Sequence, residues 1–286
     1  MHRCVTGALD MAGLGAAALR KIAVDAECRT DIAVLEAAIA RDVAAGATPF
    51  LIVGTAGAVD TGAIDDFTEL HRIAAAHGAW LHADAAFGAL AALSPTHAPK
   101  LRGIEHADSV AFDFHKWAQV TYDAGCLLVR DPAIQYATFA QKTGYLAGAS
   151  RGLAGGAPWP CDLGPDLSRG FRALKIWMTL SAYGTGQLGG VVDTTCALAQ
   201  RLAARVEKSA ALRLCAPVNL NIVCFAVEGF NDEQTEALVA DLQEEGLFAP
   251  STTRIGGRLC IRAAIVNHRT NAQDIDDFVA EILRRA

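Results

Sequence analysis

Short apolar runs alternate with helical patterns along the first half of the chain. Each run has the length of one strand, and the stretches between runs carry apolar residues at helical spacing. Ile32, Leu35 and Ile39 share one helical face behind Asp31, which predicts a helix that Asp31 caps. Asp65 is predicted to open a further helix that ends at Gly78. Such alternation is typical of an α/β fold with a mostly parallel sheet and helices on both faces. The predicted strands cover residues 22–25, 49–53, 79–84, 107–112 and 125–129, and the predicted helices cover 5–20, 31–45 and 65–78.

The second half of the chain has a different pattern. Asp131 and Pro132 predict the start of another helix. Residues 141–165 are rich in glycine, proline and alanine, and we expect a long mobile loop there. Beyond it the pattern predicts helices at 171–177, 187–208, 231–246 and 272–284, with strands at 219–227 and 258–266. We therefore expect a large domain over residues 1–185 and a small C-terminal α+β domain over residues 186–286.

Composition narrows the class of protein. The 286 residues are 52% hydrophobic, yet no uninterrupted apolar run approaches the roughly 18 residues of a membrane span. The net charge of −6, with no basic stripe, argues against nucleic acid as the main partner. The chain starts without the basic and apolar regions of a signal peptide. Its eight cysteines form no Cys-x-x-Cys pair, so we expect reduced thiols and a cytoplasmic location.

Lys116 is the first candidate for chemistry. It follows a predicted strand and is flanked by Phe114, His115 and Trp117. A lysine ammonium is costly to desolvate, so aromatic surroundings favour the neutral amine, which condenses with carbonyls to form Schiff bases. In the alternative, the lysine stem packs on Trp117 while the charged end stays in water.

Asp84 is the second candidate. An apolar strand leads to it, and Ala85, Ala86 and Gly88 follow within a few residues. A carboxylate for a pyridine nitrogen, a small side chain under the ring and a Schiff-base lysine opposite are what pyridoxal phosphate requires.

Several motifs together carry a family resemblance. His82-x-Asp84-Ala-Ala-Phe-Gly and Asp113-Phe-His-Lys-Trp117 resemble the signatures of group II pyridoxal-phosphate-dependent amino acid decarboxylases, in particular the aromatic-L-amino-acid decarboxylases. Residues 55–65, 164–175 and 262–270 resemble other segments of that family in the same order. The resemblance implies an aspartate aminotransferase-like fold (fold type I of the pyridoxal-phosphate enzymes), with pyridoxal 5'-phosphate as the cofactor.

The resemblance also implies roles for single residues. Lys116 would form the Schiff base with the cofactor and Asp84 would pair with its pyridinium nitrogen, while Ala86 lies against one ring face. His115 and Asp113 would help to hold the phosphate end.

For four further residues, the resemblance implies a place at the site through motifs that are less specific. His2 matches the histidine that stacks on the other ring face, and Thr55 belongs to the loop beside the cofactor. Tyr145 matches the loop tyrosine that protonates the carbanion centre after carbon dioxide leaves. Arg169 is a candidate for a contact near the site.

The chain departs from the family pattern in three places. It begins at the stacking histidine, so we expect an N-terminally truncated chain without the family's dimerisation segment and Gly-rich phosphate loop. Ala58 and Val59 stand where the family often has two threonines, and Phe114 stands where proline is more usual.

Other motifs fit less well. Residues 13–18 approach a dinucleotide fingerprint but lack a preceding strand, and residues 148–152 match a hydrolase elbow only by letters. His82 and Asp84 supply two metal ligands without a third nearby, so no metal site is predicted.

The sequence therefore predicts decarboxylation of an L-amino acid, with aromatic substrates favoured, to the corresponding amine. The expected partners are a small amino acid substrate and, in the full-length form, a second copy in a homodimer. Two alternatives stay open: a truncated, non-catalytic relic of such an enzyme, and a transaminase or aldehyde-lyase with the same lysine and aspartate. A hydride-transfer enzyme is a more distant third.

Overall fold

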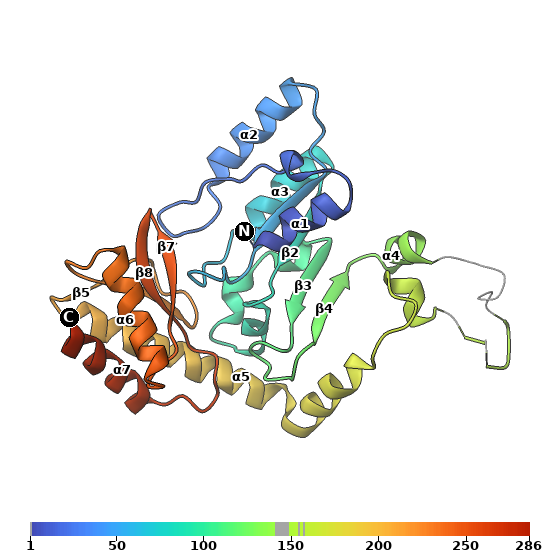
Figure 1. The fold of residues 1–286 in the computed structure, drawn as a ribbon. Coiled ribbons are helices and arrows are strands. Elements are labelled where there is room, and N and C mark those ends of the chain that lie inside the picture. The colour runs from blue at the N-terminus through green and yellow to red at the C-terminus, as the bar shows by residue number, and fades with distance from the viewer. Residues whose placement is uncertain (1, 141–148, 154, 157) are drawn as a thin grey trace.

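A computed structural model describes residues 2–140, 149–153, 155–156 and 158–286 of the chain. It contains two sheets, one in each half of the molecule (Figure 1). Among the described residues, no helix is both long enough and apolar enough to cross a membrane.

The first sheet is mostly parallel, as predicted. Its strand order is β1-β2-β3-β4, in which β1, β2 and β3 run parallel and β4 runs antiparallel to β3. The register places Thr55 beside Asp84, and Asp84 beside Ala111. The strands are β1 Leu51–Thr55, β2 Trp80–Asp84, β3 Ser109–Asp113 and β4 Gly125–Val129.

Carboxylate caps fix where the helices around this sheet begin. Asp31 accepts a hydrogen bond from the backbone of Val34, and Asp131 accepts one from Ala133, as the sequence predicted. The prediction that Asp65 opens the next helix is wrong, because Asp66 is the capping residue. Asp65 is buried instead. The helices of this part are α1 Arg3–Met11, α2 Ile32–Ala44, α3 Phe67–His77 and α4 Pro132–Phe139, with 3-10 turns at Ala16–Ala18, Ala89–Leu93, Ala98–Leu101, Ile104–His106 and Pro160–Leu163.

The second sheet is antiparallel, with the order β5-β6-β8-β7. The sequence pattern predicted β6 and β8 and missed β5 and β7, which are short or only partly buried. The helices α6 and α7 begin with capping boxes at Asn231 and Asn271. The elements are β5 Leu212–Leu214, β6 Ile222–Val227, α6 Asp232–Glu244, β7 Ser251–Ile255, β8 Arg258–Ala264 and α7 Ala272–Arg285.

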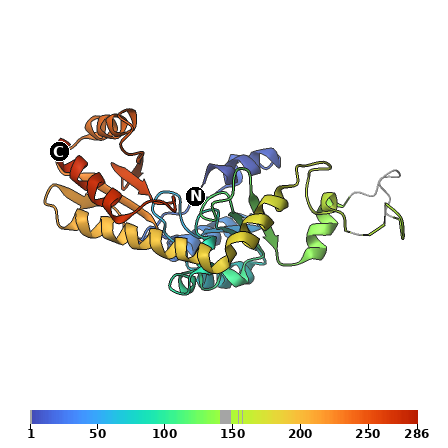
Figure 2. The same cartoon turned by 90° about the horizontal axis from the view of Figure 1, so that it is seen from below.

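The long helix α5, Arg172–Glu207, connects the two halves (Figures 1 and 2). The sequence predicted two helices here, and the structure has one run with non-helical backbone at Gly184 (φ 73°, ψ 162°). Beyond Gly184, Val192 and Cys196 pack in the core of the first sheet, whereas Leu202 and Val206 pack in the core of the second. One helix thus contributes to both hydrophobic cores. The division into domains at residue 185 stays a proposal, which the break at Gly184 supports.

The prediction of a strand at residues 22–25 is wrong. Only Val24 forms an isolated bridge there, with Thr30. The remaining residues of this segment are not paired with a strand among the described residues.

Candidate active site

Three strand ends of the first sheet bring the predicted residues together. Thr55, Asp84 and Asp113 are the last residues of β1, β2 and β3. Because these strands are parallel neighbours, their carboxyl ends meet at one edge of the sheet. Ligands of open α/β sheets bind at this edge.

Asp84 is held close to the small residues that follow it. Its Oδ1 accepts a hydrogen bond of 3.3 Å from the backbone N–H of Ala86. Two glycines behind this turn allow the loops after β1 and β2 to touch: a Cβ on Gly88 would lie 2.4 Å from the carbonyl oxygen of Ala56, and one on Gly57 would lie 2.8 Å from Gly88. The backbone after Asp84 is therefore fixed by close packing.

Lys116 lies in the turn that follows β3. Its Nζ is 2.8 Å from Oδ2 of Asp113, and the Nε2 of His115 is 3.6 Å from the same oxygen. One carboxylate thus pairs with Lys116 and lies beside the ring of His115. The amine of Lys116 has an ionic partner that the sequence analysis did not include, in place of a purely aromatic environment.

His115 is oriented from its other side. Its Nδ1 accepts a hydrogen bond of 2.9 Å from the backbone N–H of Ala124, so the ring proton of the neutral form is on Nε2. Its ring packs on Tyr122, with 4.1 Å between the ring centroids. His115 therefore presents an N–H donor towards Asp113.

Trp117 anchors the turn in the core. It is 1% exposed, its Nε1 donates to Oγ1 of Thr195 at 3.0 Å, and its ring stacks on Phe87. Since Thr195 belongs to α5, the tryptophan fixes the lysine turn to the long helix. Trp117 is therefore a residue of the hydrophobic core.

Thr55 is held through Asp65. The Oδ2 of Asp65 accepts from the backbone N–H of Thr55 at 2.7 Å, and its Oδ1 accepts from that of Thr30 at 2.6 Å. A buried carboxylate at this position ties three segments together. The sequence predicted Asp65 as the helix cap because two aspartates, at 65 and 66, stand at the start of the helical pattern, and the pattern alone does not tell which one caps.

The start of α1 lies near this edge. His2 is its N-cap, and the Nδ1 of His2 accepts from the backbone N–H of Cys4. The pKa of the Cys4 thiol is raised by partial burial and by the carboxylate of Asp84, while Lys116 acts in the opposite direction. Cys4 in the first turn of α1 is thus within electrostatic range of both Asp84 and Lys116, although no direct contact of His2 with them is present among the described residues.

Two further predicted site residues are Tyr145 and Arg169. Tyr145 lies outside the described residues. Arg169 is exposed, and no hydrogen bond or ion pair joins it to Lys116 or Asp84 among the described residues. Its neighbour Arg172 pairs instead with Asp123, at 2.6 Å.

Sequence reasoning missed a contact from the second half of the chain. Gln119, three residues after Lys116, has a left-handed backbone (φ 60°). Its Nε2 donates to the carbonyl of Val266 at 2.8 Å, and its Oε1 is 3.1 Å from Nδ1 of His268. In the sequence, only the family resemblance of residues 262–270 pointed to this segment, and that resemblance did not indicate Gln119 as its partner.

A second network that the sequence did not predict surrounds His82, two residues before Asp84 on β2. The hydroxyl of Ser109 is 2.7 Å from Nδ1 of His82 and accepts from Nε1 of Trp80, also at 2.7 Å. Burial lowers the pKa of His82, an effect that the nearby Asp84 opposes. Among the described residues, no group of three or more potential ligands could hold a metal ion.

Comparison with known proteins assigns the family. The pyridoxal-dependent decarboxylase conserved domain matches residues 1–228 of the chain. The chain belongs to this family. It is 30% identical to the aromatic-L-amino-acid decarboxylase of Bacillus atrophaeus, over 98% of this chain and 60% of the relative. It is 33% identical to the L-2,4-diaminobutyrate decarboxylase of Rhizobium meliloti, over 94% of this chain and 55% of the relative.

A solved decarboxylase structure has the same fold. The structure of Oryza sativa TDC with PLP and tryptamine superposes with a TM-score of 0.93 at 26% identity, covering 100% of this chain and 60% of that chain. The fold type I prediction is therefore confirmed. The chain spans roughly half to two thirds of the length of these relatives.

The donor set at the sheet edge fits the cofactor of this family. Lys116 offers an amine for an aldehyde, and Asp84 offers a carboxylate for a ring nitrogen. Ala86, between them in the chain, adds only a methyl group at this edge. The Nε2 of His115 is a donor that suits a phosphate oxygen.

Proposed function

We propose that this chain is the lysine-bearing part of a decarboxylase that removes the carboxylate of an L-amino acid, with aromatic substrates favoured. The observation that carries the proposal is the meeting of Thr55, Asp84 and the Asp113–Lys116 turn at the carboxyl ends of three adjacent parallel strands. Family membership supports the reaction class. The aromatic preference is supported by the relative from Bacillus atrophaeus, while the relative from Rhizobium meliloti keeps a diamino substrate as the competing choice.

The proposed roles follow from the chemistry of each side chain. When bound, pyridoxal phosphate supplies a carbonyl that condenses with amines and a cationic ring that accepts the electron pair of the bond broken at Cα. Lys116 provides the amine that binds this carbonyl, and Asp84 provides the negative charge that keeps a proton on the ring nitrogen. Ala86 leaves room for a flat ring, and Thr55 and His2 border it.

Asp113 and His115 act at the phosphate end in different ways. His115 carries its proton on Nε2 and can donate it in a hydrogen bond to a phosphate oxygen. Asp113, an acceptor only, positions His115 and Lys116 instead of contacting the phosphate itself. For Tyr145, we retain the proposal that it supports protonation at Cα.

We further propose that the protein works as a homodimer in the cytoplasm. Large apolar side chains are exposed at the start of α5: Phe171, its N-cap, is 75% exposed, Trp177 is 65% exposed and Met178 is 57% exposed. On β4, Leu128 is 56% exposed. Apolar surface of this kind marks protein interfaces. All eight cysteines are free thiols, which suits a reducing compartment.

Borohydride reduction in the presence of pyridoxal phosphate tests the proposal. Among the six lysines of the chain, Lys116 should carry the phosphopyridoxyl group, located by mass spectrometry of the peptides. Lys116→Ala should abolish the label. Lys175→Ala is the matched control, because Lys175 pairs with the exposed Asp123 and should leave the label in place.

The outcome separates the proposal from its alternatives. A single label on Lys116, followed by release of amine and carbon dioxide from an aromatic amino acid, supports the decarboxylase. A label without amine release would favour a transaminase or aldehyde-lyase with the same lysine. Labelling spread over several lysines would show that the chain alone does not form the site, as expected of a non-catalytic relic.

A further inference from the structure

The indole N–H of Trp117 donates to the hydroxyl of Thr195 inside the core. Each of the two side chains is 1% exposed, and 3.0 Å separates Nε1 of Trp117 from Oγ1 of Thr195. The hydroxyl proton of Thr195 is directed back into its own helix, where the carbonyl oxygens of Val191 and Val192 lie at 2.8 Å and 3.1 Å. The threonine oxygen is therefore the acceptor of the indole proton, at a place closed to solvent.

Trp117 directly follows Lys116 in the turn after β3. Adjacent residues share one rigid peptide unit, so the placement of one restricts the placement of the other. Trp117 points into the core of the first sheet, whereas the amine of Lys116 points to Asp113. The ion pair with Asp113 restrains only the end of a flexible four-carbon side chain. The tryptophan restrains the backbone from which that side chain starts.

The backbone hydrogen bonds at the lysine are long. The N–H of Lys116 is 3.4 Å from the carbonyl of Asp113, and the N–H of Gln119 is 3.2 Å from the carbonyl of Lys116. Good N–H···O bonds are about 2.9–3.0 Å long, so these two hold the turn weakly. The buried side chain of Trp117 is a stronger anchor than the backbone bonds of the turn itself.

The same part of α5 also holds the loop that follows β2. The Oδ1 of Asp193 accepts from the hydroxyl of Ser94, which is fully buried. Ser94 ends the 3-10 turn Ala89–Leu93, and a Cβ on Gly189 would overlap the carbonyl oxygen of Leu93. Helix α5 is thus in contact with the loops after both β2 and β3, which carry the proposed cofactor contacts.

Phe87 joins these two loops. It follows Asp84 by three residues, and its ring stacks on that of Trp117 with 5.7 Å between the ring centroids. Phe87 is only 8% exposed, so neither ring can move without disturbing the core. A shift of Trp117 would therefore change the position of Lys116 relative to Asp84.

Loss of the threonine hydroxyl would act next to the reactive amine. A buried indole N–H without an acceptor is unfavourable, because it has left water and gained no partner. The ring must then turn or admit a water molecule, and the adjacent Lys116 moves with it. A misplacement of about 1 Å costs on the order of 10²-fold in the rate of a reaction between positioned groups.

We propose that Thr195 is a positioning residue for Lys116: acting through the indole of Trp117, it holds the lysine amine in the orientation in which the amine binds the carbonyl of pyridoxal phosphate. This role rests on the proposed function, since it takes Lys116 as the residue that binds the cofactor.

Three substitutions on one turn of α5 test this role. Thr195→Val keeps the shape of the side chain and removes the acceptor, whereas Thr195→Ser restores the acceptor. Thr194→Val is the matched control, because Thr194 is exposed and its hydroxyl donates to the carbonyl of Gly190, four residues back, at 2.8 Å. Each protein is incubated with pyridoxal phosphate and reduced with borohydride after increasing times. Mass spectrometry then quantifies the phosphopyridoxyl group on Lys116 and, as an internal reference, on Lys175.

The rate of labelling should follow the hydroxyl at position 195. Thr195→Val should lower the rate at Lys116 about tenfold relative to the rate at Lys175. Thr195→Ser should restore the ratio to within about threefold, and Thr194→Val should leave it unchanged. A ratio unchanged in Thr195→Val would overturn the proposal. So would a loss that Thr195→Ser does not recover, or one that Thr194→Val shares, because either would be a general effect on the helix.

Hydrogen exchange without cofactor separates this proposal from the proposed function. The N–H of Val120 donates to the carbonyl of Phe114 at 3.2 Å and closes the lysine turn. Thr195→Val should speed exchange of this amide about tenfold, and Thr194→Val should not. If the unmodified chain labels Lys116 no faster than Lys175, the proposed function fails, and exchange at Val120 still decides whether Thr195 holds the turn.

A fourth variant covers a failure of Thr195→Val to fold. Thr195→Cys keeps the size of the side chain and offers only a weak acceptor. Its labelling ratio should lie below that of Thr195→Ser. Equal ratios in these two variants would overturn the proposal.

Discussion

The amine of Lys116 lies 2.8 Å from the carboxylate of Asp113, three residues before it in the same turn. The backbone N–H of Lys116 also points to the carbonyl of Asp113, at 3.4 Å. The Asp-x-His-Lys spacing after β3 therefore places the lysine amine and the His115 ring beside one carboxylate. Gly125 on β4 makes room for it, since a Cβ there would lie 3.2 Å from Oδ1 of Asp113.

Removing the charge of Asp113 should affect both stability and cofactor retention. We expect Asp113→Asn to lower the free energy of unfolding by about 1–2 kcal/mol, because a mostly buried carboxylate that pairs with Lys116 is lost. Urea unfolding measures this change. The variant should also lose pyridoxal phosphate faster on dialysis, because Lys116 and His115 lose their orientation.

Glu69→Gln is the matched control for that experiment. Glu69 pairs with Arg72 at the same i,i+3 spacing and 2.9 Å, but both side chains are more exposed. We expect a change below about 0.5 kcal/mol and unchanged cofactor retention. Equal destabilisation by the two variants would show that the Asp113 pair has no special role.

The strand ends of the site could be predicted because they depend on local pattern. Apolar runs located β1, β2 and β3, and the parallel topology then required Thr55, Asp84 and Lys116 to meet at one edge. Motif spacing identified which residues at that edge carry chemistry. These features follow from the alternation of strands and helices, which a single sequence displays.

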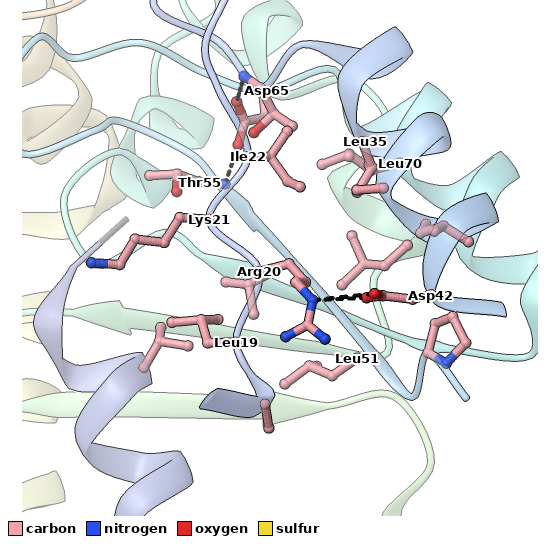
Figure 3. Close-up of a pocket in the computed structure, with 18 of the residues that line it drawn as sticks. Leu19, Arg20, Lys21, Ile22, Leu35, Asp42, Leu51, Thr55, Asp65 and Leu70 are labelled. Atoms are coloured by element: carbon pink, nitrogen blue, oxygen red, sulfur yellow. Dashed lines mark hydrogen bonds and ion pairs between the residues drawn. The ribbon is translucent and has the colours of Figure 1, made fainter. Parts of the chain in front are cut away.

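Contacts between distant segments could not be predicted in the same way. Asp65 binds the backbone of Thr30 and Thr55, and Gln119 binds Val266, yet no local pattern distinguishes these residues from ordinary loop residues. The predicted strand at 22–25 failed for a related reason. Its apolar pattern suits a strand, but a cavity lies between this segment and β1 (Figure 3).

Gly88 should not tolerate a side chain. In Gly88→Ala the new Cβ would lie 2.4 Å from the carbonyl oxygen of Ala56, so the loop behind Asp84 must move. We expect a loss of about 1–3 kcal/mol in thermal or urea unfolding. Gly190→Ala in α5 is the control: nothing lies within 4 Å of its Cβ position, and alanine should stabilise the helix by about 0.5–1 kcal/mol. A neutral Gly88→Ala would show that the two loops are not closely packed in solution.

Gln119 combines backbone strain with a contact between the two halves of the chain. Gln119→Ala and Gln119→Gly both remove the hydrogen bonds to Val266 and His268, but only glycine also relieves the left-handed backbone. We therefore expect the alanine variant to unfold more easily than the glycine variant by about 1 kcal/mol. Both should exchange backbone amides faster near residue 266. Equal stability of the two variants would mean that residue 119 is not held in the left-handed region.

Two half-buried histidines determine the expected response to mild acid. Burial lowers the pKa of His82 below its ordinary value of 6.5, against the opposing effect of Asp84. Burial also lowers the pKa of His97, assisted by Lys100 and opposed by Asp193. The folded chain thus favours the neutral form of both rings.

Stability should therefore fall as the pH drops through 6.5. In the unfolded chain both histidines have the ordinary pKa, so as the pH falls the unfolded chain binds protons before the folded chain does. The contribution of each neutral ring to stability is therefore complete above pH 6.5. It is lost as the pH falls from 6.5 towards the lower pKa of the folded state. Each histidine adds at most about 1.4 kcal/mol per pH unit to the slope. Urea unfolding between pH 7.5 and about 5.5, a window above the titration of ordinary carboxylates, measures it. His82→Gln and His97→Gln should each reduce the slope, with His77→Gln as the control for replacing an exposed histidine. A slope that survives both replacements together would assign the acid sensitivity to other groups.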